Sequence, residues 1–183
     1  MISFNVVAST SEDTVVATYE PSKVRSDSYQ SEAELEKEFI RLLCEQGYTY
    51  LPLHTEDELI ANLRSQLEEL NHYQFSDTEW RQFFSDVIAN PNEHIPEKTR
   101  KIQDWEESKQ VLHRDDGSSK NITLIDKKNI HNNRLQVINQ YEVKQADGAR
   151  HDNRYDVTIL VNGFPLVHVE LKRRGVAIRE AFN

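Results

Sequence analysis

The first half of the chain carries hydrophobic residues at helical spacing. Apolar residues recur every three or four positions in residues 31–47, 55–71 and 76–90. Each stretch begins with a Ser or Thr that is followed three residues later by a Glu, a pattern typical of a capping box at a helix start. The sequence therefore predicts three helices, with the cap pairs Ser31 and Glu34, Thr55 and Glu58, and Ser76 and Glu79.

The apolar faces of these helices are expected to point into a core. They comprise Leu35, Phe39, Leu42 and Leu43, then Leu59, Leu63, Leu67 and Leu70, then Trp80, Phe83, Phe84 and Val87. Gly47 is a natural cap for the end of the first helix. Pro91 and Pro96 are expected to end the third helical region. Cys44 lies within the first helix, where we expect a small buried hydrophobic side chain.

The period changes in the second half, where the apolar runs are typical of strands. Residues 121–126, 133–143, 155–162 and 164–172 are rich in Val, Ile, Leu and Thr. Two further short strands are possible within the first 20 residues, and residues 114–120 are typical of a turn. Residues 176–183 resemble the start of a helix. The order of elements predicts a mixed α/β (α+β) protein whose sheet is built largely from hairpins.

Composition narrows the class. The chain has 183 residues, 37% apolar and 29% charged, which is enough for one domain with its own core. No run reaches the roughly 18 apolar residues of a membrane helix, and the N-terminus lacks the pattern of a secretory signal. A single cysteine excludes an internal disulfide and favours a reducing, cytoplasmic location. The seven histidines show no metal-binding spacing, so zinc is not expected.

Charge is unevenly distributed along the chain. The formal net charge is −9, which argues against strong autonomous binding of nucleic acid, because Lys and Arg supply the affinity for phosphate. Residues 150–183, however, hold six basic and four acidic residues, a local charge of +2 against −11 for the remainder. This sign change indicates an anionic ligand near the C-terminal segment.

Candidate chemistry lies in the same segment, in two apolar strands around an Asn-Gly turn. Asp156 opens the first strand, whereas Glu170 and Lys172 interrupt the end of the second. Two carboxylates near a sheet core are costly unless a cation compensates them, and Mg²⁺ prefers such oxygen ligands. Alternation along a strand places Glu170 and Lys172 on one face, with Leu171 on the other.

Whether Asp156 shares that face depends on the hairpin register. A two-residue Asn162-Gly163 turn pairs Asp156 with Val169 and leaves Glu170 on the opposite face. A three-residue loop pairs Asp156 with His168, and all three charged residues then share a face. We expect the three-residue loop or an equivalent bulge, because Gly suits the third loop position. His168 is expected to be a plain cross-strand neighbour.

The spacing Asp-x13-Glu-x-Lys resembles that of the PD-(D/E)xK nucleases. The surrounding sequence, residues 153–183 together with "LIDKKN" and "SYQSEAELEKEFIRLL", resembles the N-terminal nuclease domain of the R subunit of type I restriction endonucleases. The resemblance extends from about Ser28 to the end. It implies a PD-(D/E)xK core, a central mixed sheet flanked by helices. Tyr155 stands where the name of the motif has Pro, a departure common in this family.

The resemblance also implies a set of site residues. Asp156 and Glu170 match the metal-binding acids, with the Leu171 carbonyl as a further ligand of Mg²⁺, and Lys172 matches the motif lysine. Glu36, or alternatively Glu32, matches the helix glutamate that faces the site. The expected activity is magnesium-dependent, nonspecific hydrolysis of DNA phosphodiester bonds. Three basic residues are expected to contact DNA phosphates, Arg173, Arg174 and Arg179.

The same resemblance sets the expected organisation. Residues 1–28 form an N-terminal extension, and residues 29–183 form an endonuclease domain truncated at its C-terminal side. The family's Gln-x-x-x-Tyr helix lies beyond Phe182, and no P-loop motif occurs, so ATP would serve only motor domains absent from this chain. Expected partners are double-stranded DNA and, through the full-length subunit, the modification and specificity subunits, with no membrane.

Alternative interpretations remain at this point. Glu170 and Lys172 also fit an exposed charge pair at a strand end, and the glutamates of residues 32–38 fit a solvated helix face. A noncatalytic module that binds DNA or docks subunits would share the fold of a nuclease without its activity. A standalone repair or resolvase-type nuclease would share both.

Overall fold

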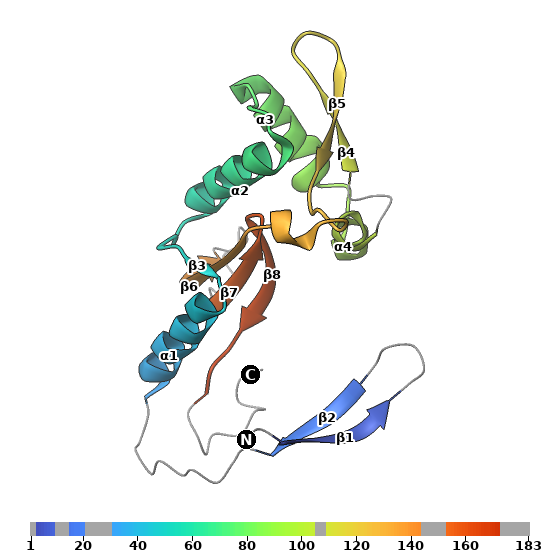
Figure 1. Ribbon diagram of the computed structural model, residues 1–183. Coiled ribbons are helices and arrows are strands. Elements are labelled where there is room, and N and C mark those ends of the chain that lie inside the picture. Colours follow the sequence, from blue (N-terminus) through green and yellow to red (C-terminus); the bar gives the residue numbers. More distant parts are fainter. Residues whose placement is uncertain (1–2, 10–14, 21–30, 105–108, 144–152, 173–183) are drawn as a thin grey trace. The chain divides into compact units, whose positions relative to one another are not determined.

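The computed structural model describes residues 3–9, 15–20, 31–104, 109–143 and 153–172 (Figure 1). The chain divides into two units, Met1–Gln30 and Ser31–Asn183. In the first unit, β1 (Ser3–Ser9) pairs antiparallel with β2 (Val15–Glu20), as the two N-terminal apolar runs suggested. The predicted boundary at residue 28 stays a prediction, as does truncation of the endonuclease domain.

Three capped helices open the second unit. They are α1 (Glu32–Glu45), α2 (Glu56–Asn71) and α3 (Asp77–Phe83). Each begins with the predicted capping box, in which a Ser or Thr side chain accepts a hydrogen bond from the backbone of the glutamate three residues later. The glutamate carboxylate in turn accepts from the cap backbone, so two unpaired donors are satisfied at each helix start.

The helical region continues further than the sequence indicated. After α3 the chain forms a π-helical turn, Phe84–Ile88, and then α4 (Ile95–Gln103). The third helical region ends at Ile88, before Pro91, as predicted. Pro96 lies in the first turn of α4 and does not end a helix, so that part of the prediction was wrong. Proline fits there because the first turn needs no intrahelical N–H donor and its φ is already helical.

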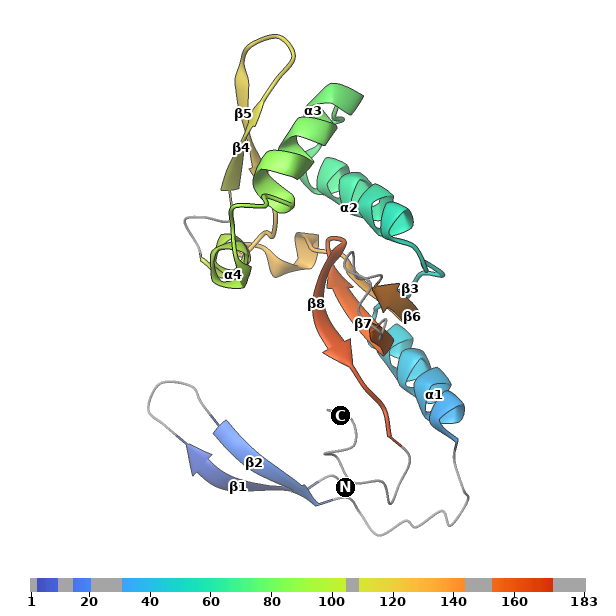
Figure 2. The same cartoon turned by 180° about the vertical axis from the view of Figure 1, so that it is seen from behind.

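Within its described residues the second unit contains two sheets. The larger has the strand order β3-β6-β7-β8, with β3 (Thr49–Tyr50) parallel to β6 (Leu135–Val143), and β7 (Asn153–Val161) antiparallel to both β6 and β8 (Phe164–Val169). Figure 2 shows β8 beside β7 on the side of the sheet away from β3.

The smaller sheet is a separate hairpin in the middle of the sequence. It pairs β4 (Lys109–His113) with β5 (Ser119–Thr123) across the predicted turn. The predicted strand 121–126 therefore begins earlier and ends at Thr123, and a 3₁₀ turn, Ile130–Asn132, precedes β6. The overall class, mixed α/β, is confirmed.

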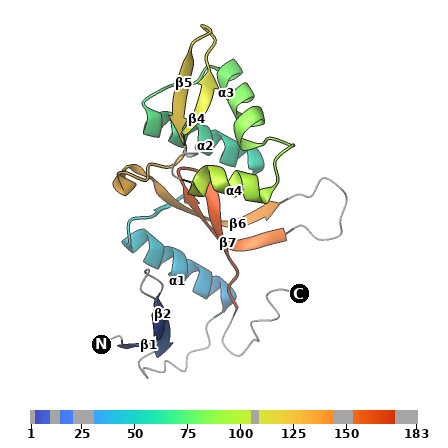
Figure 3. The same ribbon diagram turned by 90° about the vertical axis from the view of Figure 1, so that its right-hand side faces the viewer.

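Helices α1 and α2 cover opposite faces of the larger sheet (Figure 3). Val137 and Val157 pack with Leu43 of α1, whereas Ile138 and Leu160 pack with Leu59 of α2. This division follows from strand alternation, because consecutive residues point to opposite faces. A third cluster joins α2, α3 and the β4–β5 hairpin to the start of β8: Leu63, Leu67, Phe75, Trp80, Phe83, Leu112, Ile122, Leu124 and Phe164.

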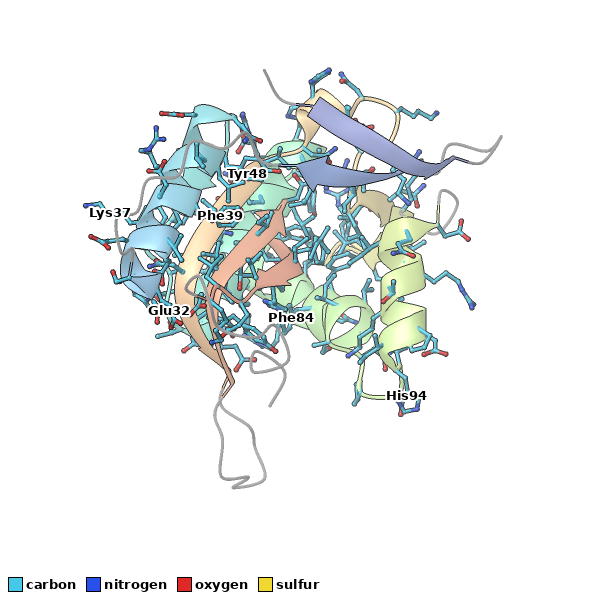
Figure 4. The ribbon with its side chains drawn as sticks, turned by 90° about the horizontal axis from the view of Figure 1, so that it is seen from below. Glu32, Lys37, Phe39, Tyr48, Phe84 and His94 are labelled. Atoms are coloured by element: carbon cyan, nitrogen blue, oxygen red, sulfur yellow. The ribbon has the colours of Figure 1, made fainter. Side chains whose placement is uncertain are left out.

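Six of the twelve predicted core positions are buried and five are half-buried, and two predictions were wrong. Leu42 is 41% exposed and Cys44 is exposed, whereas Leu43 between them is 7% exposed. Figure 4 shows Phe39 on the side of α1 that faces the sheet and Lys37 on its outer side. The apolar stripe of α1 is thus narrower than its sequence suggested.

Candidate active site

The turn between β7 and β8 has two residues. Val161 pairs with Phe164, and the residues between them, Asn162 and Gly163, have φ of 50° and 84°. Two successive left-handed residues favour the tight turn that matches strand twist, and Asn-Gly is the preferred sequence for it. A Cβ at Gly163 would lie 2.7 Å from the Leu63 Cα of α2, so close packing also requires glycine there. The predicted three-residue loop was wrong.

A β-bulge compensates for the tight turn. Leu160 pairs with Pro165, but Ile159 pairs with Val167, so Leu166 is an extra residue in β8. Beyond the bulge Thr158 pairs with His168 and Val157 with Val169. By count the next facing positions are Asp156 and Glu170, just beyond the last observed pair. The alternative of an equivalent bulge is confirmed, although Asp156 lies beyond His168 and not opposite it.

Direct contacts join the ends of the two strands. Asp156 Oδ2 accepts a 2.7 Å hydrogen bond from the Leu171 backbone N–H, and Lys172 Nζ donates to Glu170 Oε1 at 2.5 Å. The Leu171 side chain packs in the α1 cluster. Glu170 and Lys172 contact each other, which agrees with their predicted common side, and Asp156 is bonded to the backbone of the residue between them.

Three carboxylates influence the ammonium group of Lys172. Its pKa is raised, first by the hydrogen bond to Glu170 and further by the charges of Glu170, Glu32 and Asp156, while burial acts in the opposite direction. Side-chain exposure is 28% for Lys172 and 33% for Glu170, so the pair is open enough to meet a ligand. The charges of the two hairpin acids and of the first residue of α1 thus all favour the charged form of Lys172.

The two helix glutamates occupy successive turns of one face of α1. Glu32 lies at the start of the helix (Figure 4) and acts on Lys172 through its charge. Glu36 lies one turn further, where both of its oxygens accept hydrogen bonds from side chains of β6. Asn139 Nδ2 donates to Glu36 Oε1 at 2.6 Å, and Gln140 Nε2 donates to Oε2. Residues i and i+4 share a helix face, which explains the common direction.

Sequence reasoning missed Asn139 and Gln140. The available signal was two consecutive amide side chains inside an otherwise apolar strand, "LQVINQYEV". It was missed because strand alternation assigns neighbouring residues to opposite faces, so Asn139 and Gln140 were not expected to bind the same carboxylate.

His168 lies on the same strand as Glu170, two positions earlier. Its Nδ1 is 2.9 Å from Thr158 Oγ1, and its ring stacks on Tyr155 with 4.0 Å between ring centroids. Burial lowers the pKa of His168, so its neutral form is favoured. The pairing with Thr158 agrees with the prediction of a cross-strand neighbour.

For the remaining predicted residues, no contact with the site is observed in the described part of the chain. Arg173, Arg174 and Arg179 lie outside the described residues. The Leu171 carbonyl stays a prediction, since its N–H is the backbone group whose partner is seen.

The chemistry of the donors suits a hard divalent cation. Within the described ranges no group of three or more His, Cys, Asp or Glu side chains is arranged to hold a metal. Asp156 and Glu170 provide two carboxylates, and Mg²⁺ is bound by one or two carboxylates with water and substrate phosphate. The residues present therefore fit magnesium better than a metal that needs a complete protein cage.

Comparison with known proteins gives consistent matches. Residues 29–183 match the family described as the type I restriction enzyme R protein N terminus. The chain is 47% identical over 178 residues to the type I restriction enzyme EcoprrI endonuclease subunit of Escherichia coli, covering 97% of this chain and 55% of that protein. It is 38% identical over 160 residues to the SsaAORF53P endonuclease subunit of Staphylococcus saprophyticus, covering 85% of this chain and 16% of the relative.

The chain thus spans about half the length of the Escherichia coli relative and a smaller share of the staphylococcal one. Within the part of the chain that the structure describes, no helix combines the length and apolar character needed to cross a bilayer.

Proposed function

The chain belongs to the family of type I restriction enzyme R protein N termini, and from this premise we propose that it is a magnesium-dependent endonuclease domain that hydrolyses DNA phosphodiester bonds. The observation that carries the proposal is the register of the β7–β8 hairpin. A two-residue turn alone would set Asp156 opposite Val169, and the bulge at Leu166 sets it opposite Glu170 by count. The contacts of Asp156 with Leu171 and of Lys172 with Glu170 support a shared site.

The proposal includes a PD-(D/E)xK core. Its support is the position of the motif within the fold: the Asp lies near the start of β7, and the Glu-x-Lys triplet directly follows β8. Both strands pack on α1, whose first two turns supply Glu32 and Glu36. A mixed four-stranded sheet with a helix on each face agrees with such a core.

Asp156, Glu170 and the Leu171 carbonyl would hold the metal ion. The chemistry that bound magnesium supplies is polarisation of the scissile phosphate and a lower pKa of a coordinated water. The hydrogen bond from the Leu171 N–H fixes one Asp156 oxygen and leaves the other for a ligand. Glu170 presents its carboxylate from the adjacent chain segment.

Lys172 would act as a fixed cation. Its pKa is raised by the hydrogen bond to Glu170, so the ammonium form is favoured. A protonated lysine at this place can orient the attacking water or stabilise charge on the phosphate as it develops. Its ion pair with Glu170 holds it at the site before substrate arrives.

DNA contact would rely on backbone phosphates, not on bases. Arg173, Arg174 and Arg179 follow the catalytic lysine and are proposed to bind neighbouring phosphates, which carry no sequence information. Nonspecific cutting follows, with site recognition left to the modification and specificity subunits of a cytoplasmic, ATP-driven restriction complex. In that complex ATP is proposed to serve the motor domains of the full-length subunit.

The test replaces Asp156 with Asn and Lys172 with Ala in the complete R subunit, assembled with its partner subunits. Each change removes a group at the reacting phosphate and should lower magnesium-dependent cleavage of plasmid DNA by at least about a hundredfold. DNA binding by the complex should persist.

Lys37→Ala is the matched control, because Lys37 is an exposed lysine on the outer side of α1 (Figure 4). Cleavage by this control should equal that of the unchanged enzyme. Full cleavage by both Asp156→Asn and Lys172→Ala would instead identify a noncatalytic docking or DNA-binding module.

A further inference from the structure

Strand β6 carries a backbone irregularity beside the candidate site. Gln140 has φ of 53°, a left-handed value that residues other than glycine adopt rarely and at a cost. The pairs Asn139–Val157 and Tyr141–Tyr155 flank it, and no pair forms between them. By count the position that faces Gln140 across the sheet is Asp156.

This irregularity changes where two side chains point. In a regular strand Asn139 and Gln140 would point to opposite faces of the sheet. In the observed conformation both amides donate to one carboxylate, that of Glu36, and occupy its two oxygens. The left-handed backbone at Gln140 is therefore what allows neighbouring residues to share a target.

The contact extends to a further strand. Tyr50 of β3 donates its hydroxyl hydrogen to Asn139 Oδ1 at 2.8 Å, which leaves the Asn139 amide nitrogen oriented toward Glu36. Asn139 and Gln140, which we call the amide clamp, thus connect α1 to β6 and β3. One helical turn before Glu36, Glu32 acts on Lys172.

We propose that Gln140 is a positioning residue of the nuclease site: through the amide clamp it holds Glu36, and with it the acidic face of α1, in place beside Asp156. The inference rests on the proposed nuclease function and deepens it. Two neutral donors fix the orientation of a carboxylate without removing its charge, which is the usual role of residues that surround metal ligands. The strained backbone of Gln140 is retained for this orientation, and not for pairing of the strands.

Three variants separate the side chain from the backbone. Gln140→Ala removes the amide and keeps the strained conformation, whereas Gln140→Gly removes the amide and relieves the strain, because glycine adopts positive φ freely. Gln136→Ala is the matched control. Gln136 is a second glutamine of β6 that bonds to a helix residue, Asn62 of α2, on a contact remote from Asp156.

The first readout uses the metal-free chain. In a double-mutant cycle the unfolding midpoint should fall on Gln140→Ala, and this fall should disappear when Glu36 is already alanine. Gln140→Gly should unfold at a higher denaturant concentration than Gln140→Ala. A fall of equal size in both Glu36 backgrounds would show that the clamp does not form in solution and would overturn the proposal.

The second readout is metal affinity. Binding of Mn²⁺ to the chain, measured by calorimetry, should weaken about tenfold in both Gln140→Ala and Gln140→Gly, and be unchanged in Gln136→Ala. In the assembled complex the Mg²⁺ concentration for half-maximal cleavage should rise in parallel, with little change in the rate at saturating Mg²⁺.

The measurements distinguish failure of the positioning role from failure of the proposed function. If Gln140→Gly binds Mn²⁺ like the unchanged chain while Asp156→Asn loses binding, the positioning role is wrong and the nuclease function stands. If Asp156→Asn itself keeps both Mn²⁺ binding and cleavage, the proposed function is wrong, and the role of the amide clamp in it is wrong too.

Discussion

Two glutamates at the same position of a capping box differ in how much they contribute to stability, because their surroundings differ. Glu58 and Glu79 both occupy the third position of a helix capping box, but Glu58 is exposed whereas Glu79 is 5% exposed. Burial raises the pKa of Glu79, yet donors from Ser76, Tyr73 and Asp115 and the nearby charge of Arg114 outweigh it, so the pKa is lowered overall. Glu79 therefore joins α3 to the β4–β5 hairpin.

Replacement of Glu79 by Gln should lower the stability of the chain at pH 7 by roughly 2–3 kcal/mol. The carboxylate accepts from the Tyr73 hydroxyl and Ser76 N–H on one oxygen and from the Asp115 N–H on the other, and an amide can satisfy one side only. Because the folded pKa is lowered, this stability is present above the unfolded pKa of about 4.3 and is lost as the pH falls below it.

Denaturant unfolding at pH 7 and pH 3 checks this prediction, since the gap between the two proteins should narrow at pH 3. Glu58→Gln is the control with the same position in its capping box, and its loss should be smaller. Equal losses of stability in the two variants would show that burial of Glu79 does not increase its contribution to stability.

At the scale of elements, the β7–β8 hairpin shows how turn and bulge act together. The Asn-Gly turn is fixed by local chemistry, and on its own it predicts a register in which Glu170 faces away from Asp156. The single extra residue at Leu166 shifts the pairing by one position over the rest of the strand, which by count sets Asp156 opposite Glu170. The site thus depends on a feature several residues away from any proposed catalytic group.

One alanine inserted between Val169 and Glu170 should abolish magnesium-dependent cleavage while the fold is kept. The insertion follows the last residue of β8, so every strand pair remains, but Glu170 and Lys172 move to the opposite face. Circular dichroism and plasmid cleavage measure the two effects.

The same alanine inserted after Gly117, in the turn between β4 and β5, serves as the comparison and should leave cleavage unchanged. Undiminished cleavage by the first insertion would contradict the register argument.

At the scale of the whole molecule, separate hydrophobic clusters stabilise separate parts of the second unit. Leu67 lies in the cluster of α2, α3 and the β4–β5 hairpin, whereas Leu43 anchors α1 against β6 and β7. The candidate site depends on the cluster around Leu43, because α1 carries Glu32 and Glu36 and because the Leu171 side chain packs in that cluster. A cavity in the Leu67 cluster should therefore lower stability alone, whereas a cavity in the Leu43 cluster should lower stability and also affect activity.

Leu67→Ala should destabilise the chain by about 3 kcal/mol and leave the magnesium requirement of cleavage unchanged, because its cavity lies in the remote cluster. Leu43→Ala should destabilise the chain and also raise the magnesium requirement, since α1 would lose its anchor on the sheet. Thermal unfolding and magnesium titration of cleavage measure both. The same magnesium requirement in the two variants would show that α1 does not position the site.

Local signals explain what could be predicted from the chain alone. The capping boxes, the strands of the C-terminal hairpin, the mixed α/β class and the family all rest on residues close together in sequence. The candidate acids Asp156 and Glu170 were found by their spacing, and their roles remain proposals.

What the chain alone left open depends on contacts between distant segments. The exposure of Cys44 reflects how α1 meets the sheet, and the left-handed backbone of Gln140 is seen together with its contact to Glu36, 104 positions away. The pairing of β7 with β8 beyond Ile159 was undecided between two registers until the bulge was seen. Hydrogen bonds within a few residues of one another are encoded locally, whereas a register and a helix face are chosen by packing, and packing exists only in the folded chain.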